Sequence, residues 1–205
     1  MYYFTSDTHF CHTGIITKSR TQFSSIDDMN RLILNNINAK LSRKDTLYIV
    51  GDMFFGSSAP VKEIMAEIKP KIILIKGNHD KDWLKKLSSD EKDLLFSGIH
   101  DTLGLKKYGY EIHLSHYPLL AWNRSHYFGT SFSICGHIHG RRDSTAAAQL
   151  FPLVKCQFNC GVDINNFEPV NFEELVRNNA EFYGTEYTRE ESEKMNKAIE
   201  ALMKN

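Results

Sequence analysis

Residues 71–80, Lys-Ile-Ile-Leu-Ile-Lys-Gly-Asn-His-Asp, join a short apolar segment to a group of polar side chains. The run Ile72–Ile75 predicts a strand that is buried on both faces, as in a parallel sheet covered by helices. A glycine ends this strand, and Asn78, His79 and Asp80 follow it. Open α/β sheets bind their ligands beyond the carboxyl ends of the strands, which is where these side chains are expected. This local sequence is also compatible with an ordinary strand-to-helix turn that binds no ligand. Other segments of the chain are needed to distinguish the two interpretations.

Two earlier segments have the same arrangement of an apolar strand followed by polar side chains. Tyr2–Ser6 predicts a strand that leads into Asp7 and His9, and Thr46–Val50 predicts one that leads into Asp52. Carboxylates and imidazoles are both good metal ligands. Each of these strand ends therefore offers at least one candidate ligand.

Helical patterns separate the three strands. Ser25 suits the N-cap of a helix whose apolar residues recur at intervals of three and four, and a second helix is expected from about Pro60 to Ile68. Strand-helix-strand units of this length favour a parallel sheet with right-handed crossovers. The first candidate ligands are therefore expected along one edge of that sheet.

The middle of the chain predicts further strands. Residues 82–96 have the pattern of a helix in two pieces. A hairpin is expected from Ile99–Leu105 and Tyr110–Ser115, with its turn near Tyr108-Gly109. Strands that complete a sheet are predicted at Ser131–Cys135, Leu150–Val154 and Gln157–Cys160.

Capping-box patterns predict two terminal helices. Asn171 with Glu174, and Thr188 with Glu191, have the spacing of reciprocal N-terminal caps. The last helix is expected from about 188 to 203, and its thin apolar stripe predicts that it packs on the outside. No repeat, linker or low-complexity segment divides the chain, so residues 1–205 are predicted to form a single domain.

The balanced charge of the chain disfavours a strongly electrostatic partner. Lys plus Arg and Asp plus Glu number 25 each among 205 residues. Nucleic acid is therefore a disfavoured but open alternative, and no run is long enough to span a membrane. The four cysteines have no metal-site spacing, and apolar strand residues begin at Tyr2 without a charged leader. These features favour a cytoplasmic protein, whereas the oligomeric state is not predicted.

Candidate metal ligands follow two later strands as well. The strand that ends at Ser115 leads into His116, and the strand that ends at Cys135 leads into His137 and His139. Oxygen and imidazole donors without thiolates suit divalent ions such as Mn, Fe, Zn, Co or Ni. The donors outnumber the needs of one ion, which indicates two ions that share a carboxylate.

In this order the motifs resemble the signature of the calcineurin-like metallophosphoesterase superfamily, which is D-x-H, G-D, G-N-H-D/E, H and G-H-x-H. Any one motif is a weak signal, but the ordered set extends over the first two thirds of the chain. The matching segments are Asp7-Thr-His9, Gly51-Asp52, Gly77-Asn-His-Asp80, His116 and Gly136-His-Ile-His139. The resemblance implies an α/β fold, a two-sheet β-sandwich flanked by helices in four αββα layers. The nearest general likeness is a compact bacterial or phage-type phosphodiesterase.

The resemblance also implies a role for each motif residue. One ion would be held by Asp7, His9, Asp52 and His139, and the other by Asp52, Asn78, His116 and His137, with Asp52 as the bridge. His79 would protonate the leaving group, and Asp80 would orient the His79 ring and favour its charged form. The implied reaction is hydrolysis of a phosphodiester by a hydroxide that bridges the two ions. The expected partner is a small phosphate ester.

Further side chains are predicted to contact the substrate. His12 lies just beyond the first motif, and Arg141 and Arg142 lie just beyond the last. Arg124 and His126 lie in the polar loop between the last two motifs. Arginine and histidine at these positions are suited to hold a phosphate.

Other functions remain to be weighed against a phosphodiesterase. They are a phosphomonoesterase that acts on a small metabolite, a non-catalytic scaffold with this fold, and an exonuclease. The full set of ligands argues against a scaffold, and the balanced composition argues against a nuclease. The segment Met53-Phe-Phe-Gly56 replaces the Asp-Arg-Gly of Ser/Thr protein phosphatases of this superfamily, which disfavours that subclass. An apolar wall at this position favours a nucleoside or an organic ester as the substrate.

Overall fold

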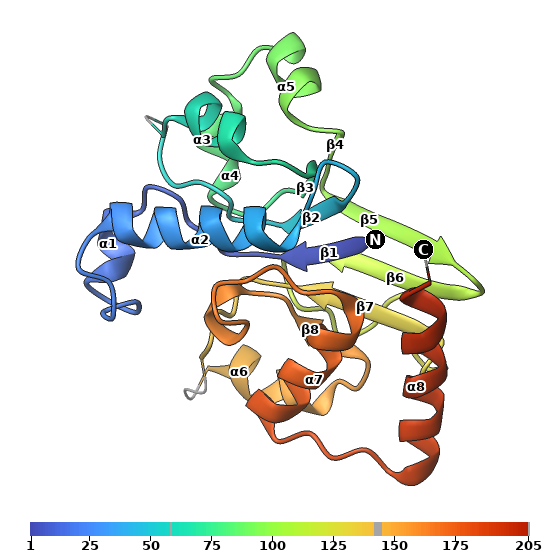
Figure 1. The fold of residues 1–205 in the computed structure, drawn as a ribbon. Helices are drawn as coiled ribbons and strands as arrows, with labels where there is room; N and C mark the ends of the chain where they lie inside the picture. Colours follow the sequence, from blue (N-terminus) through green and yellow to red (C-terminus); the bar gives the residue numbers. More distant parts are fainter. Residues whose placement is uncertain (58, 142–144, 205) are drawn as a thin grey trace.

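Two four-stranded sheets form the centre of the protein in a computed structural model that describes residues 1–57, 59–141 and 145–204 (Figure 1). The first sheet is entirely parallel, and the second is parallel except for one antiparallel pair, β5 with β6. In spatial order the first sheet contains β1 (Tyr2–Thr5), β2 (Thr46–Val50), β3 (Lys71–Ile75) and β4 (Gly98–His100). The second contains β5 (Thr102–Lys107), β6 (Tyr110–Ser115), β7 (Ser131–Cys135) and β8 (Gln157–Asn159).

Helices cover both outer faces of the pair of sheets, as Figure 1 shows. The helices near the first sheet are α1 (Thr13–Ile16), α2 (Ile26–Lys40), α3 (Val61–Glu67), α4 (Asp80–Leu84) and α5 (Ser89–Leu95). Those near the second sheet are α6 (Ala146–Leu150), α7 (Phe172–Tyr183) and α8 (Arg189–Leu202), with short 3-10 helices at Phe151–Leu153 and Val162–Ile164. The predicted two-sheet sandwich with flanking helices is therefore confirmed.

Strand β2 shows why this fold needs apolar residues at nearly every strand position. Leu47 and Ile49 belong to the core between the first sheet and its helices. Tyr48 and Val50 point to the opposite face and belong to the core that the two sheets share with α7 and α8. Each fully buried aliphatic side chain stabilises the fold by about 1.5–3 kcal/mol. Because β2 is covered on both faces, its sequence is a continuous apolar run instead of an alternating one.

The predicted helix caps are present. The Ser25 side chain accepts a hydrogen bond from the backbone of Asp28 at the start of α2. Asn171 and Thr188 form complete capping boxes with Glu174 and Glu191 at the starts of α7 and α8. The last helix therefore begins and ends within one residue of the predicted bounds.

One strand prediction is wrong, and another is wrong in part. Residues 150–154 do not form a strand, because α6 ends at Leu150 and a 3-10 helix follows it. Alanines favour the helix that precedes this segment, and Pro152 has no N–H to give to a sheet. The segment Ile99–Leu105 is divided at Asp101 between β4 of the first sheet and β5 of the second. The hairpin of β5 and β6 nevertheless turns at the predicted Tyr108-Gly109.

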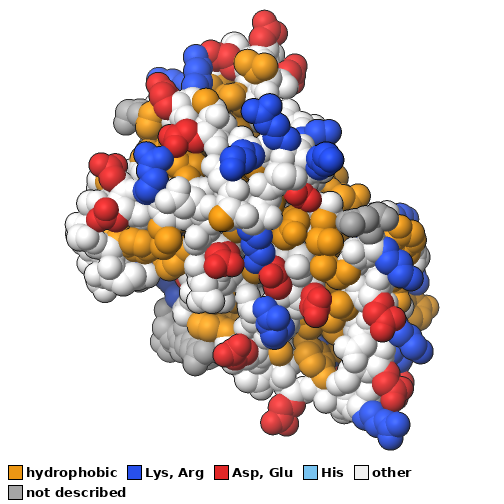
Figure 2. All heavy atoms as spheres, in the orientation of Figure 1, with side chains coloured by type: hydrophobic (Ala, Val, Ile, Leu, Met, Phe, Trp, Pro, Cys, Tyr) orange, Lys and Arg blue, Asp and Glu red, His pale blue; other side chains and the backbone are white. Residues whose placement is uncertain are grey.

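The surface matches the balanced composition of the chain. Figure 2 shows acidic and basic side chains interspersed on one face, with hydrophobic side chains between them. Among the described residues no helix is long and apolar enough to cross a membrane.

Candidate metal centre

The loops that follow β1, β2 and β7 hold the candidate ligands in an uncommon backbone conformation. Positive φ angles occur at Asp7 (55°), His9 (48°), Asp52 (54°), His137 (71°) and His139 (51°). This left-handed region costs a non-glycine residue roughly 1–2 kcal/mol. Hydrogen bonds between the loops hold it in place, including one from the Asp7 amide to the Gly51 carbonyl at 3.0 Å and one from the His9 amide to the Asp52 carbonyl at 3.1 Å. The loops from neighbouring strands thus fix one another and aim their side chains at a common point.

Asp7, His9 and His139 form the first cluster of candidate ligands. One ligand atom from each lies within 4.8 Å of the others. The Nε2 atom of His9 is buried and has no hydrogen-bond partner among the described residues. Burial, followed by the positive charge of His139, lowers the pKa of His9 to about 2, so its ring is neutral and offers a lone pair. An unpaired imidazole nitrogen beside a carboxylate fits a divalent metal ion.

Asp52, His116 and His137 form the second cluster, again within 4.8 Å. The Oδ1 atom of Asn78 lies 3.2 Å from His116 Nε2 and adds a neutral oxygen. The other ring nitrogen of His116 lies 2.9 Å from the Val50 carbonyl, which directs Nε2 toward the cluster. Burial alone would lower the pKa of His116, but the hydrogen bond with Asp52 and the charges of Asp7 and Asp52 raise it to about 9. The two carboxylates therefore make the cluster strongly attractive to a cation.

One oxygen of Asp52 lies between the two clusters. Asp52 Oδ2 is 3.8 Å from His9 Nε2 and 3.4 Å from His116 Nε2. Burial would raise the pKa of the Asp52 carboxyl, but the hydrogen bond and charge of His116 lower it to about 2. The other oxygen accepts the backbone amide of His79 at 2.9 Å. An ionised carboxylate in this position fits a ligand shared by two ions.

Sequence patterns missed Asp163 and Arg20, which support the first cluster. Asp163 Oδ2 lies 2.8 Å from His139 Nδ1, so the Nε2 atom of the same ring faces the cluster. The fully buried Arg20 donates to both oxygens of Asp163, at 2.8 and 2.9 Å, and to the backbone carbonyl of Thr8. The partners are separated by 143 residues, and neither lies in a recognisable motif. To identify them from the sequence, one would have to know that Arg20 is buried, because a buried arginine needs a carboxylate partner.

The predicted role of Asp80 as a support for the His79 ring is wrong. Asp80 is fully buried, and its two oxygens accept the backbone amides of Asp52, Met53 and Gly77 at 2.7–2.9 Å. The indole of Trp83 donates to it as well, at 3.0 Å. These four N–H donors occupy both oxygens of Asp80, so neither oxygen is left to accept a hydrogen bond from the His79 ring. Asp80 instead ties the loop after β2 to the loop after β3.

His79 and His12 lie side by side at the rim of the clusters. The His79 side chain is 39% exposed, and its Nε2 atom is 4.0 Å from Asp52 Oδ2. His12 Nδ1 lies 3.4 Å from His9 Nδ1, and the His12 ring stacks on Phe55 with centroids 3.6 Å apart. The expected position of His12 near the site is therefore correct, and Phe55 supplies an apolar wall.

Of the arginines predicted to contact substrate, Arg141 lies at the site and Arg124 does not. A groove of about 590 Å³ borders the first cluster, and Arg141, Lys18 and His12 line it. Arg124 instead lies 3.7 Å from Glu111, near the beginning of β6 and far from the end that leads into the site. The loop returns to the start of this strand, so Arg124 does not line the groove with Arg141. The His126 ring contacts the Tyr127 ring in the same loop at a tilt of 42°, and Arg142 lies outside the described residues.

Tyr117 borders the second cluster. Its hydroxyl lies 3.5 Å from Asn78 Oδ1, and its ring centroid lies 4.7 Å from that of His137. Nearly half of the side chain is exposed. Tyr117 therefore forms the side of the site opposite the groove of His12 and Arg141.

A sequence profile for calcineurin-like phosphoesterases matches residues 2–190. The chain therefore belongs to the calcineurin-like phosphoesterase family, as its motifs and its two-sheet fold indicate. Membership implies phosphoric ester hydrolase chemistry with divalent metal ions, and the two clusters are candidate sites for such ions.

Two proteins without a described function are similar to this chain. The uncharacterised protein MJ1445 of Methanocaldococcus jannaschii is 27% identical over 180 residues, which cover 85% of this chain and 89% of that protein. The crystal structure of AQ665 from Aquifex aeolicus, a protein of unknown function, superposes with a TM-score of 0.64 at 27% identity, over 86% of this chain and 98% of that one. These relatives support the fold, and the substrate must be inferred from the site itself.

Proposed function

We propose that the protein hydrolyses phosphodiesters with two divalent ions, one in each cluster. The observation that carries this proposal is the position of Asp52 Oδ2, which lies within 4 Å of a ring nitrogen from each cluster. Asp7, His9 and His139 would hold one ion, and Asn78, His116 and His137 the other. When bound, two such ions polarise the phosphoryl oxygens and lower the pKa of water near them.

The space around the clusters supports a diester over a monoester. The groove of His12 and Arg141 opens beside the first cluster. A second groove, which Gly77 and Tyr117 line, opens beside the second cluster. A phosphodiester has two substituents and would use both grooves, whereas a monoester has only one.

The chain's own residues supply the remaining steps. His79 is partly exposed at the rim, so its ring can reach the departing ester oxygen and give it a proton. Arg141 and Lys18 bring positive charge to one ester arm, and Phe55 brings an apolar surface. Asp80 keeps the loops of Asp52 and His79 in register through its backbone hydrogen bonds.

A metal and substrate panel tests this proposal. Metal-free protein would be reconstituted with Mn, Ni, Zn or Fe and offered bis-p-nitrophenyl phosphate or p-nitrophenyl phosphate. We expect a higher kcat/KM on the diester with at least one metal. Asp52→Asn should abolish the activity, whereas Asp82→Asn, at an exposed position of α4, should leave it unchanged. A higher kcat/KM on the monoester would make the protein a phosphomonoesterase, and two bound ions without turnover of either ester would favour a scaffold.

A further inference from the structure

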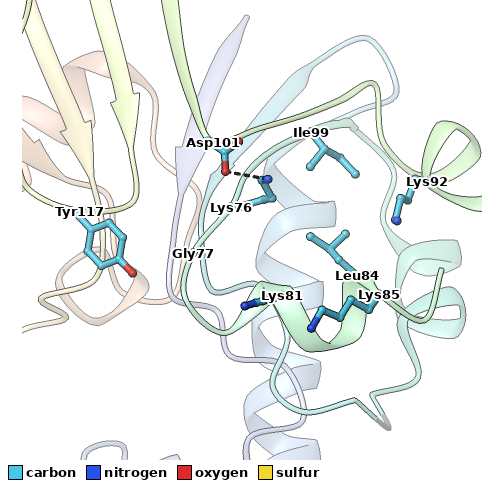
Figure 3. A pocket seen from close by; sticks show the side chains of 9 residues that line it. All are labelled: Lys76, Gly77, Lys81, Leu84, Lys85, Lys92, Ile99, Asp101 and Tyr117. Atoms are coloured by element: carbon cyan, nitrogen blue, oxygen red, sulfur yellow. Dashed lines mark ion pairs between the residues drawn. The ribbon is translucent and has the colours of Figure 1, made fainter. Parts of the chain in front are cut away.

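Lysines are the most frequent residue type in the lining of the groove beside the second cluster. The groove has a volume of about 580 Å³ and lies between α4, α5, the end of β3 and Tyr117 (Figure 3). Leu84 and Ile99 form its apolar floor. The basic side chains that line it are Lys76, Lys81, Lys85 and Lys92.

Most of the positive charge in this groove is not neutralised. Lys76 forms an ion pair with Asp101 at 2.8 Å, shown as a dashed line in Figure 3. Asp101 is also the only acidic residue among those that line the groove. Lys81, Lys85 and Lys92 pair with no carboxylate in the described part of the chain. Four lysines against one aspartate leave a net charge of +3 in a protein whose overall charge is zero.

The position of these lysines links the groove to the metal centre. Lys81 comes two residues after His79, and Lys85, the C-cap of α4, follows one helical turn later on the same side. Figure 3 shows Tyr117 on the opposite side, with Gly77 between it and the lysines. Gly77 precedes the candidate ligand Asn78, and the Tyr117 hydroxyl lies 3.5 Å from the Asn78 side chain. A substrate arm that leaves the second cluster past Tyr117 therefore enters the lysine groove.

We propose that this groove binds a further phosphate group carried on one ester arm of the substrate. This inference rests on the proposed phosphodiesterase function and narrows its substrate class. The apolar floor suits a sugar or a base, and the unpaired ammonium groups suit a phosphate beyond it. A short oligonucleotide and a phosphorylated small molecule both have this chemistry. The zero net charge of the chain is compatible with either ligand, because the positive charge is concentrated in the groove.

Two esters that differ only in the remote phosphate test the inference. One is thymidine 5′-(p-nitrophenyl phosphate), and the other is the same diester with a 3′-phosphate. The scissile bond and the leaving group are identical, so only the remote charge can separate their KM values. We expect a KM about ten-fold lower for the phosphorylated ester at low salt, as a few exposed charge contacts would give. The difference in KM between the two esters should decrease at higher salt, because salt screens the charge contacts.

Variants then assign the effect to the groove. The triple variant Lys81→Gln, Lys85→Gln, Lys92→Gln should lose the preference for the phosphorylated ester and still hydrolyse the unphosphorylated one. A control with the same change of charge, Lys44→Gln, Lys86→Gln, Lys197→Gln, alters exposed lysines outside the groove and should keep the preference. Equal KM values in the wild type, or a preference that survives in the groove variant, would overturn the inference without touching the diesterase activity. A further fall in KM when two more nucleotides extend the phosphorylated arm would identify an oligonucleotide, and an unchanged KM a small molecule.

A binding measurement separates failure of this inference from failure of the proposed function. If neither ester is hydrolysed, thymidine 3′,5′-bisphosphate would serve as a probe of the metal-loaded protein, with lysine acetylation followed by mass spectrometry. Protection of Lys81, Lys85 and Lys92 but not of Lys86 would support the phosphate site on its own. Equal acetylation with and without the probe would refute it.

Discussion

Removal of the Asp163 carboxylate should destabilise the fold and weaken one metal cluster at the same time. Asp163 is the only acidic partner of the buried Arg20 among the described residues, and it also contacts His139 Nδ1. In Asp163→Ala the guanidinium would keep its backbone carbonyl partners but lose both charged hydrogen bonds. A buried charge without its counter-ion is one of the few causes of a large loss from a single substitution.

The expected loss of stability is about 3–5 kcal/mol, the cost of breaking a buried ion pair by removing one partner. Glu193→Ala is a matched control, because it breaks the exposed i,i+4 pair with Arg189 on α8 and should cost no more than about 0.5 kcal/mol. Burial would raise the pKa of Asp163, but hydrogen bonds from His139 and Arg20 hold it well below its usual range. The Asp163 carboxylate therefore contributes fully to stability above about pH 4, where the same carboxyl in the unfolded chain is also ionised. This contribution is lost as the pH falls through the lower pKa of the folded state.

The effect on metal binding should be confined to the cluster of Asp7, His9 and His139. Loss of the group that orients a ligating histidine typically lowers metal affinity 10–100-fold. Among the described residues, the ion pairs of Asp163 are with Arg20 and His139 and not with His116 or His137, so the affinity of the second ion should change little.

Urea denaturation of the metal-free protein measures the first effect, and calorimetric titration with Mn²⁺ measures the second. Because Asp163→Ala leaves a charge behind, Arg20→Met combined with Asp163→Ala should recover part of the lost stability. A loss below about 1 kcal/mol for the single variant would refute the buried ion pair as a stabilising element. Equal weakening of both ions would refute the local support of His139.

Three further predictions concern other parts of the molecule. Asp52→Asn should lower the content of both ions and abolish turnover, because one carboxylate oxygen lies between the clusters; two tightly held ions in an active variant, by elemental analysis, would contradict this. His79→Ala should keep both ions and lose about 10²–10⁴-fold in rate on an alkyl phosphodiester. The loss on a nitrophenyl ester should be clearly smaller, because that leaving group needs little protonation. Equal losses on both esters would instead assign His79 to charge stabilisation. Burial raises the pKa of the cysteine thiols, that of Cys156 to about 11, so at pH 8 a disulfide reagent should react rapidly with at most the partly exposed Cys11 until the protein is unfolded.

The sequence was sufficient to predict the strands that deliver the ligands. Runs such as Ile72–Ile75 are short, apolar and followed at once by polar side chains, so both the strand and its functional end are visible in one segment. The helix starts were predictable for the same reason, since the cap and its partner are three residues apart. Local patterns therefore account for most of the fold and for the residues that gather at the site.

The parts that escaped prediction depend on contacts between distant segments. Asp163 supports His139 through a 3-10 helix that has no periodic pattern, and Arg20 reaches it from the other end of the chain. Arg124 has the composition of a phosphate ligand, yet its loop carries it to Glu111. Asp80 lies next to His79 in sequence, but the helix that begins there turns its carboxylate toward backbone amides. In each case the nearest neighbour in space is not the nearest in sequence.

Both clusters draw ligands from both sheets, and this explains why the ligand loops can keep their unfavourable backbone angles. Asp7 and His9 follow β1, and His139 follows β7, so the first cluster joins the two sheets at their edge. Asp52, which follows β2, meets His116, which follows β6, in the second cluster. Backbone hydrogen bonds between the loops already link these strands in the protein chain alone. The packing of the two sheets thus offsets the cost of the positive φ angles, and the site is preorganised because its ligands follow strands that are largely buried.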